Sequence, residues 1–145
     1  MKILVAVDGS EFTNKAVNYI ASHLQWFQGE PELHLLHVKP PIPIGLAAER
    51  ARAILGDEVV NSYYKEECEA ALAPAEKVLR EYKIAYQSHC KIGDIAHEIH
   101  AYASKNGIDM IVMGSHGHGV LANVVLGSVT TKVLAIATVP VLIVR

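Results

Sequence analysis

The sequence lacks two features that would direct it to nucleic acid or to a membrane. It has 13 basic and 15 acidic side chains, a formal charge of −2, and no clustered run of like charge. Nucleic-acid-binding proteins usually present a clustered basic face, so we expect no nucleic-acid partner. A membrane span needs roughly 20 consecutive apolar residues, and no apolar stretch of this sequence approaches that length. The first eight residues are interrupted by charge too early for a signal peptide. We therefore expect no membrane contact and a cytoplasmic location.

Cysteine is scarce, and motifs for metal binding are lacking. Cys68 and Cys90 have no CxxC spacing, so we expect two reduced thiols that pack in the interior of a cytosolic protein. His97 and His100 lie three residues apart on a predicted helix, a spacing that metals can use. No carboxylate or cysteine is placed to complete such a site, so we predict no metal site.

The sequence does contain a regular alternation of predicted strands and helices. Short apolar runs, typical of strands buried on both faces, are each followed by turn residues and then by apolar residues at helical spacing. This alternation predicts an α/β domain with a mainly parallel sheet, in which the very apolar first strand is central and the third lies nearer an edge. The predicted strands are 3–7, 33–38, 84–90, 108–113 and 141–144.

The longest predicted helix, at about 47–82, contains two residues that disfavour a helix. We expect Gly56 and Pro74 to kink or break it, because proline removes a helix hydrogen bond and clashes with the preceding turn. The apolar positions of the helix predict a face that packs on the core. These positions are Ile54, Val59, Tyr63, Leu72, Ala75, Val78 and Leu79.

Glycine is concentrated in one loop, directly after the fourth predicted strand. It occurs at positions 114, 117, 119 and 127, and Ser128 follows. Glycine lets a backbone approach a phosphate closely, and a helix that begins at about Ser128 presents unpaired N–H groups to an anion. Asp8 ends the first strand and faces the same crevice if strands one and four are neighbours. The loop therefore predicts a phosphate-binding site.

Better-known phosphate-binding motifs are lacking. No Gly-Lys pair of a Walker A loop occurs, and Gly9 alone follows the first strand, where a dinucleotide fingerprint would need three glycines. A two-component receiver needs paired acids after this strand, whereas Asp8 stands alone. We expect Asp8 to accept a hydrogen bond from ribose or base, or to help hold Mg²⁺ through water; the alternative is an aspartate that only caps the turn.

The glycine spacing resembles that of a known family. Gly114-x2-Gly117-x9-Gly127-Ser128 is similar to the ATP-binding pattern of the universal stress protein family, G-x2-G-x9-G followed by Ser or Thr. Residues 3–10, 35–38, 111–117 and 139–144 also resemble that family, in order and spacing. The resemblance implies one universal stress protein domain over residues 1–145, with an open, parallel, five-stranded sheet of order 3-2-1-4-5. Helices would cover both faces, in a Rossmann-like arrangement of the adenine nucleotide alpha-hydrolase type.

The resemblance also implies where ATP or AMP, with or without Mg²⁺, would bind. The adenosine would lie over the ends of the first two strands, and the phosphates at the glycine loop. His116 and His118, inside this loop, either contact phosphate or are exposed to solvent. The other implied site residues are Ala6, Val7, Asp8 and Val38 at base and ribose, Met113, Gly114 and Gly117 at ribose and α-phosphate, and Gly127, Ser128, Val129 and Thr130 at the phosphates.

The last predicted strand and the loop together point to a regulatory role. Residues Val141, Leu142, Ile143 and Val144 are all apolar and end the sheet, where unpaired backbone groups invite a second chain; the resemblance implies the same homodimer. We expect a nucleotide-binding, stress-response regulatory protein with an unidentified protein partner. The alternative is a slow ATPase or phosphotransferase that uses the same site. Because phosphoryl transfer needs cations on the γ-phosphate and residues 114–128 contain no Lys or Arg, we expect little or no turnover.

Overall fold

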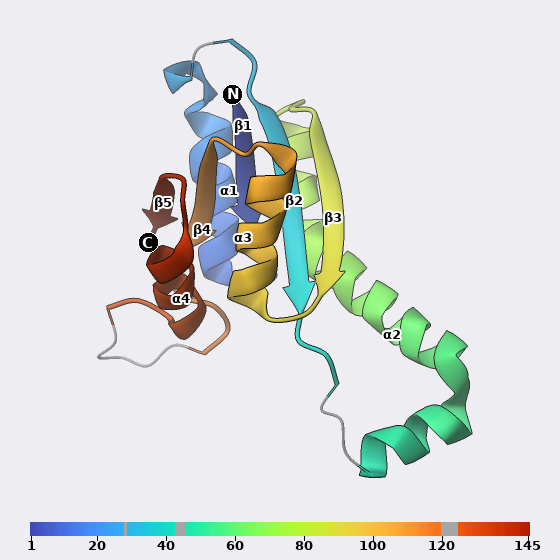
Figure 1. Cartoon of the computed structure of the whole chain (residues 1–145). Helices are drawn as coiled ribbons and strands as arrows, with labels where there is room; N and C mark the ends of the chain where they lie inside the picture. Colours follow the sequence, from blue (N-terminus) through green and yellow to red (C-terminus); the bar gives the residue numbers. More distant parts are fainter. Residues whose placement is uncertain (28, 43–45, 120–124) are drawn as a thin grey trace.

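Five parallel strands form one sheet in the order β3-β2-β1-β4-β5, as predicted (Figure 1). The computed structural model describes residues 1–27, 29–42, 46–119 and 125–145. The strands are β1 (Lys2–Ala6), β2 (Glu32–Lys39), β3 (Tyr86–Ile92), β4 (Met110–Gly114) and β5 (Val141–Val144). The helices are α1 (Glu11–Ser22), a short 3-10 helix (Leu24–Trp26), α2 (Leu46–Glu81), α3 (Ile95–Asn106) and α4 (Ser128–Ile136).

Helices cover both faces of the sheet, with α1 and α2 on one face and α3 and α4 on the other (Figure 1). The central strand, β1, sends alternate side chains to the two layers. Ile3 and Val5 pack with α1 and α2, whereas Leu4 packs in the layer of α3 and α4. Burial on both faces explains why β1 is a continuous apolar run. The predictions of a central first strand and of an edge position for the third are confirmed.

The order of the strands reverses beside β1. This strand pairs with β2 on one side and with β4 on the other, where Ile3 is the register partner of Met110 and Val5 that of Val112. The carboxyl ends of β1 and β4 therefore lie side by side. In open α/β sheets this reversal opens a crevice at the carboxyl ends of the strands. The chain thus brings residues that follow β1 next to the glycine loop that follows β4.

Helix α2 is interrupted at one of the two predicted positions. Gly56 has a backbone conformation outside the helical region (φ 79°, ψ 159°), which confirms the predicted break. The helix continues through Pro74, so no break occurs there, and the alternative of a kink stays a prediction. The neighbours Leu72 and Ala75 are buried and pack this turn onto the sheet. None of the helices in the described ranges combines the length and apolarity that a membrane span requires.

The first half of α2 does not pack on the core, contrary to the prediction. Ile54, Val59 and Tyr63 are 80%, 50% and 42% exposed. Figure 1 shows the reason, since this half of the helix extends past the edge of the sheet at β3 and away from the other elements. The second half behaves as predicted, with Leu72, Ala75 and Leu79 buried.

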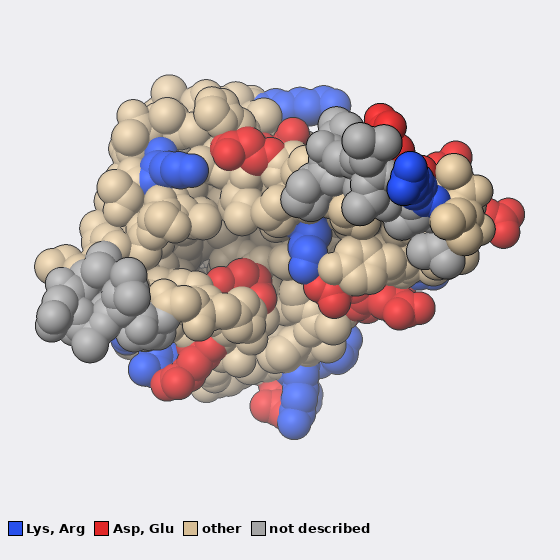
Figure 2. Space-filling model, turned by 90° about the horizontal axis from the view of Figure 1, so that it is seen from below, with Lys and Arg blue, Asp and Glu red and all other residues tan. Residues whose placement is uncertain are grey.

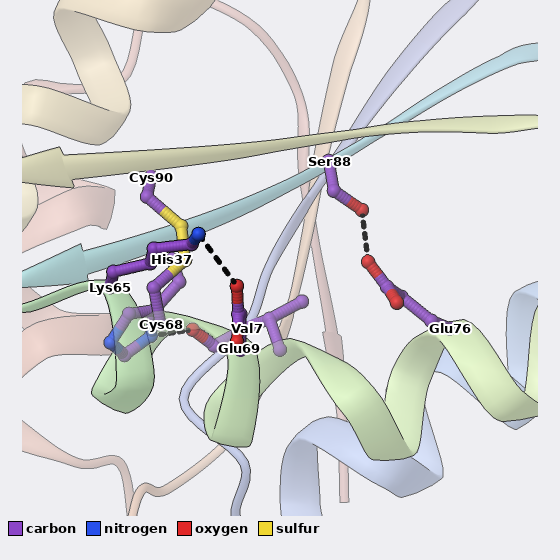
Figure 3. Close-up of a disulfide and its surroundings, with 8 residues drawn as sticks. All are labelled: Val7, His37, Lys65, Cys68, Glu69, Glu76, Ser88 and Cys90. Atoms are coloured by element: carbon purple, nitrogen blue, oxygen red, sulfur yellow. Dashed lines mark hydrogen bonds and ion pairs between the residues drawn. A yellow bond between two sulfur atoms is a disulfide. The ribbon is translucent and has the colours of Figure 1, made fainter. Parts of the chain in front are cut away.

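Cys68 of α2 and Cys90 of β3 form a disulfide, so the expectation of two reduced thiols is wrong (Figure 3). Their Cα atoms lie 6.2 Å apart, within the range of about 4.4–6.8 Å that a disulfide spans. The crossover from α2 to β3 brings the two residues together from a sequence separation of 22.

Candidate functional site

A pocket of about 290 Å³ lies at the carboxyl ends of β1, β2 and β4. Figure 2 looks onto this end of the sheet and shows a hollow near the middle of the face. Every residue predicted to form the site lines this pocket. They are Ala6, Val7, Asp8, Val38, Met113, Gly114, His116, Gly117, Gly127, Ser128, Val129 and Thr130.

The side of the pocket next to β2 is apolar. Leu36 and Val38 of β2 face Ile95 and Ile99 of α3 across the layer in which all four pack. Such walls suit a flat heteroaromatic ring, because they remove its faces from water. Leu36, Ile95 and Ile99 were not predicted as site residues. Their spacing is the same whether they line a pocket or fill a core, so periodicity alone could not find them.

Asp8 is held in a fixed orientation in the turn between β1 and α1. Its Oδ1 atom accepts hydrogen bonds from the Thr13 hydroxyl (2.5 Å) and the Ser10 N–H (2.9 Å). The chain turns at Gly9, whose φ of 78° is strained for other residues. Thr13 also lines the pocket, a role that was not predicted from the sequence. The protein's own hydrogen bonds thus fix the orientation of the carboxylate.

The glycines of the loop allow close packing within the protein itself. A Cβ on Gly114 would lie 2.7 Å from Phe12 Cβ, so this glycine lets α1 pack against the end of β4. A Cβ on Gly117 would lie 2.6 Å from Asp8 Oδ2, so this one admits the carboxylate. A Cβ on Gly127 would lie 3.2 Å from His116 Cα. The glycine spacing therefore folds the loop back on itself and against Asp8.

Helix α4 begins at the pocket, and its N-cap is Gly127. The N–H of Thr131 donates to the Gly127 carbonyl at 3.0 Å, which is the first hydrogen bond of the helical pattern. The N–H groups of residues 128–130 come before this bond, so they have no acceptor within the helix. Gly127 has no side chain to accept their bonds. The Thr130 hydroxyl donates to the Gly114 carbonyl (3.1 Å), so its proton is already engaged. These N–H groups are the donors that this end of the pocket offers to an anion.

The histidines of the pocket have partners within the protein. His118 Nε2 lies 2.7 Å from the Asp8 carbonyl oxygen, and a bond to a carbonyl requires this nitrogen to carry the proton. This bond joins the glycine loop to the β1–α1 turn. His116 Nδ1 lies 3.0 Å from Ser115 Oγ, and its ring packs against Phe12. His37 is buried next to the pocket with Nδ1 2.8 Å from the Val7 carbonyl, which is a structural role.

Comparison with known proteins settles the family. The family model described as the universal stress protein family matches residues 1–145. The chain belongs to the universal stress protein family. The universal stress protein YxiE of Bacillus subtilis is 35% identical to it, over 99% of this chain and 98% of the relative.

Solved structures of this family share the fold. Protein MJ0577 of Methanocaldococcus jannaschii has a TM-score of 0.78 and 29% identity, over 99% of this chain and 94% of that chain. The universal stress protein of Archaeoglobus fulgidus in complex with dAMP has a TM-score of 0.68 and 20% identity, over 100% of this chain and 98% of that chain. At this lower identity the likeness shows the fold alone.

The charges in the pocket of this universal stress protein are few. Asp8 is the acidic residue that lines it, and no Lys or Arg is among the described lining residues. In the described ranges, no group of three or more His, Cys, Asp or Glu side chains is placed to hold a metal ion. The described lining of the pocket thus offers hydrogen-bond donors and one carboxylate, with no fixed cation among its residues.

Proposed function

We propose that this universal stress protein binds an adenine nucleotide, ATP or AMP, as a regulatory module. The observation that carries the proposal is a single pocket that joins an apolar slot to the N-terminus of α4. An adenine ring fits the slot beside Leu36 and Val38, and the phosphates accept bonds from the N–H groups of residues 128–130. Asp8, between the two ends, accepts a bond from a ribose hydroxyl.

Two further facts support an adenine nucleotide. The spacing Gly114-x2-Gly117-x9-Gly127-Ser128 is intact, and these glycines keep the loop folded close to Asp8. The Archaeoglobus fulgidus relative is in complex with dAMP, a ligand whose adenine and single phosphate suit the two ends of the pocket. By this account AMP and ATP share the adenosine contacts, and the phosphate contacts distinguish them.

We propose binding with little or no hydrolysis. Phosphoryl transfer relies on cations that neutralise the transferred group, and no Lys or Arg is among the described residues that line the pocket. Mg²⁺ commonly binds through one or two carboxylates together with phosphate oxygens. Asp8 is the carboxylate that would hold it, so the ion would enter with the nucleotide. Phosphate release at a rate that depends on Asp8 would favour the alternative, a slow ATPase or phosphotransferase.

We also propose that the regulatory unit is a cytoplasmic homodimer that acts on a protein partner in a stress response. The carbonyls of Pro140 and Val144 accept bonds from the N–H groups of Ile111 in β4 and of Ser115 directly after it. By alternation, the backbone groups of Val141 and Ile143 point away from the sheet. An unpaired edge of this kind invites another strand, and β5 of a second copy would satisfy it.

Mass spectrometry of the small molecules released from the purified protein tests the binding proposal. We expect an adenine nucleotide to copurify or, after dialysis, the protein to retain added ATP and AMP. The absence of copurified nucleotide together with no retention of either at millimolar concentration would overturn the proposal. The same samples, incubated with Mg²⁺ and assayed for free phosphate, separate binding from turnover.

A further inference from the structure

The Cys68–Cys90 disulfide spans a second cavity, of about 440 Å³, between α2 and the strands β2 and β3. Both cysteines line it, together with Leu72 and His37. Figure 3 shows the bond running from the edge strand to the helix, close to His37. The cavity means that α2 covers this part of the sheet loosely. The disulfide closes a gap that side-chain packing leaves open.

The described side-chain hydrogen bonds between α2 and the edge strand are exposed. Glu76 Oε1 accepts a bond from the Ser88 hydroxyl at 2.7 Å (Figure 3). Arg80 Nη1 donates to the Tyr86 hydroxyl at 3.1 Å. Exposed polar pairs contribute little to stability. The disulfide is therefore the covalent tie between this part of α2 and β3, beside the apolar packing of Leu72, Ala75 and Leu79 on the sheet.

Cys68 is connected to the proposed nucleotide pocket through α2 and the turn that follows β1. Ala71, one turn along the helix, packs against Gly9 so closely that a Cβ on Gly9 would lie 3.3 Å from Ala71 Cα. Gly9 follows Asp8 in the β1–α1 turn. A shift of α2 away from the sheet would remove the support of this turn and change the orientation of the Asp8 carboxylate.

Cys90 is connected to the same pocket through the neighbouring strand β2. The register partner of Cys90 on β2 is His37, whose Nδ1 atom lies 2.8 Å from the Val7 carbonyl. Val7 lines the pocket, as does Val38, which follows His37. Both ends of the disulfide are thus within a few residues of groups that the proposed function places around the adenosine.

We propose that Cys68 and Cys90 form a reversible thiol–disulfide switch that raises nucleotide affinity when oxidised. This inference rests on the proposed function, because the affinity that it changes is that of the same pocket. Disulfides in reducing compartments are mostly transient or redox-sensing, which fits the cytoplasmic location proposed above. The oxidised form holds α2 on the sheet and Asp8 in position; the reduced form releases α2 at the cavity.

The co-reactant is a small disulfide, such as oxidised glutathione. Cys90 is exposed and Cys68 is 7% exposed, so Cys90 reacts first. Its thiolate attacks one sulfur of the small disulfide, which forms a mixed disulfide and expels one small thiolate. The Cys68 thiolate then attacks the Cys90 sulfur and expels the second. The protein loses two electrons and two protons, and the small disulfide gains both to become two thiols.

Calorimetric titration of ATP into the oxidised and the chemically reduced protein tests the switch, with thiol counting to confirm each state. We expect the oxidised form to bind about tenfold more tightly, within the usual range of coupling between sites. The Cys68→Ser/Cys90→Ser variant is the matched control. It should bind as the reduced protein does and should not respond to reductant. Equal affinity of the two redox states of the unmodified chain would overturn the proposal.

Hydrogen exchange without nucleotide separates failure of the switch from failure of the binding site. Reduction should speed the exchange of the amides of residues 9–13, because the turn loses its support from Ala71. If neither redox form binds ATP, the proposed function fails, and this exchange alone decides whether the disulfide is coupled to the turn. Exchange that is unchanged by reduction would overturn the coupling.

Discussion

The Oδ2 atom of Asp8 lies 2.6 Å from the place that a Cβ on Gly117 would take. The two residues come from opposite sides of the crevice, from the turn after β1 and from the loop after β4. Their close approach brings the Asp8 carboxylate against the glycine loop at the pocket. Gly117 is therefore required by the protein itself, in addition to any ligand that the loop binds.

Replacement of Gly117 by alanine should weaken ATP binding by about tenfold, or roughly 1.4 kcal/mol. The added methyl group displaces the Asp8 carboxylate from the ribose. A double-mutant cycle with Asp8→Ala supplies the control, since shortening Asp8 removes the clash. Gly117→Ala should then have a clearly smaller effect on the dissociation constant measured by calorimetry. Effects that simply add would show that Gly117 acts independently of Asp8.

Gly114 should matter for stability more than for binding. A Cβ there would lie 2.7 Å from Phe12 Cβ and 2.8 Å from the Phe12 carbonyl carbon, so Gly114→Ala pushes α1 off the end of β4. We expect a loss of about 1–3 kcal/mol in the free energy of unfolding, measured with urea. Gly119→Ala is the matched control, because a Cβ there meets nothing within 4 Å. Equal stability of the two variants would contradict the packing role of Gly114.

His89 should make the fold sensitive to mild acid. Burial, with smaller effects of His34 and Lys91, lowers the pKa of His89. The unfolded chain then binds this proton more readily, so the stabilising contribution is complete above the unfolded value of about 6.5 and is lost as the pH falls below it. The His34 ring stacks on the His89 ring with the two centroids 5.9 Å apart, and the centroid of the Tyr102 ring lies 5.1 Å from that of His89.

The measurement is the melting temperature of the wild type and of His89→Asn at neutral and mildly acidic pH. The wild type should lose more stability between the two conditions than the variant does. His100→Asn, on α3, is the control, and it should follow the wild type. A wild-type loss no larger than that of His89→Asn would contradict this account.

The edge strand β5 offers a test of the dimer. The backbone N–H of Ile143 points away from β4, so Ile143→Pro removes a donor from the proposed contact between copies. Light scattering at micromolar concentration should show a dimer for the wild type and a monomer for the variant. A circular dichroism spectrum confirms that the variant is folded. A monomeric wild type, or a variant that remains dimeric, would refute pairing through β5.

The sheet and most of the pocket could be predicted from the sequence because both depend on local patterns. The apolar run of β1 marks a strand buried on both faces, and the strand order follows from the resemblance. The glycine spacing places the loop, and every predicted site residue lines the pocket. Ile95 and Ile99 were missed because a helical face gives the same pattern against a ligand as against a core.

The errors concern long-range placement. Ile54 and Val59 have the periodicity of a core face, but that half of α2 extends past the edge of the sheet. The pairing of Cys68 with Cys90 depends on where the crossover from α2 brings β3, which no spacing between cysteines encodes. Local pattern fixes an element and its faces; the neighbour that each face meets depends on the whole chain.

Calorimetric titration of ATP into the wild type and into Gly127→Val tests the central claim most directly. A Cβ at position 127 would lie 3.2 Å from His116 Cα and 3.4 Å from the Ser115 carbonyl oxygen, so valine crowds the loop and the phosphate position together. The account predicts saturable binding to the wild type and none to a variant that still shows the circular dichroism spectrum of the wild type. No binding to the wild type, or unchanged affinity in Gly127→Val, would contradict it.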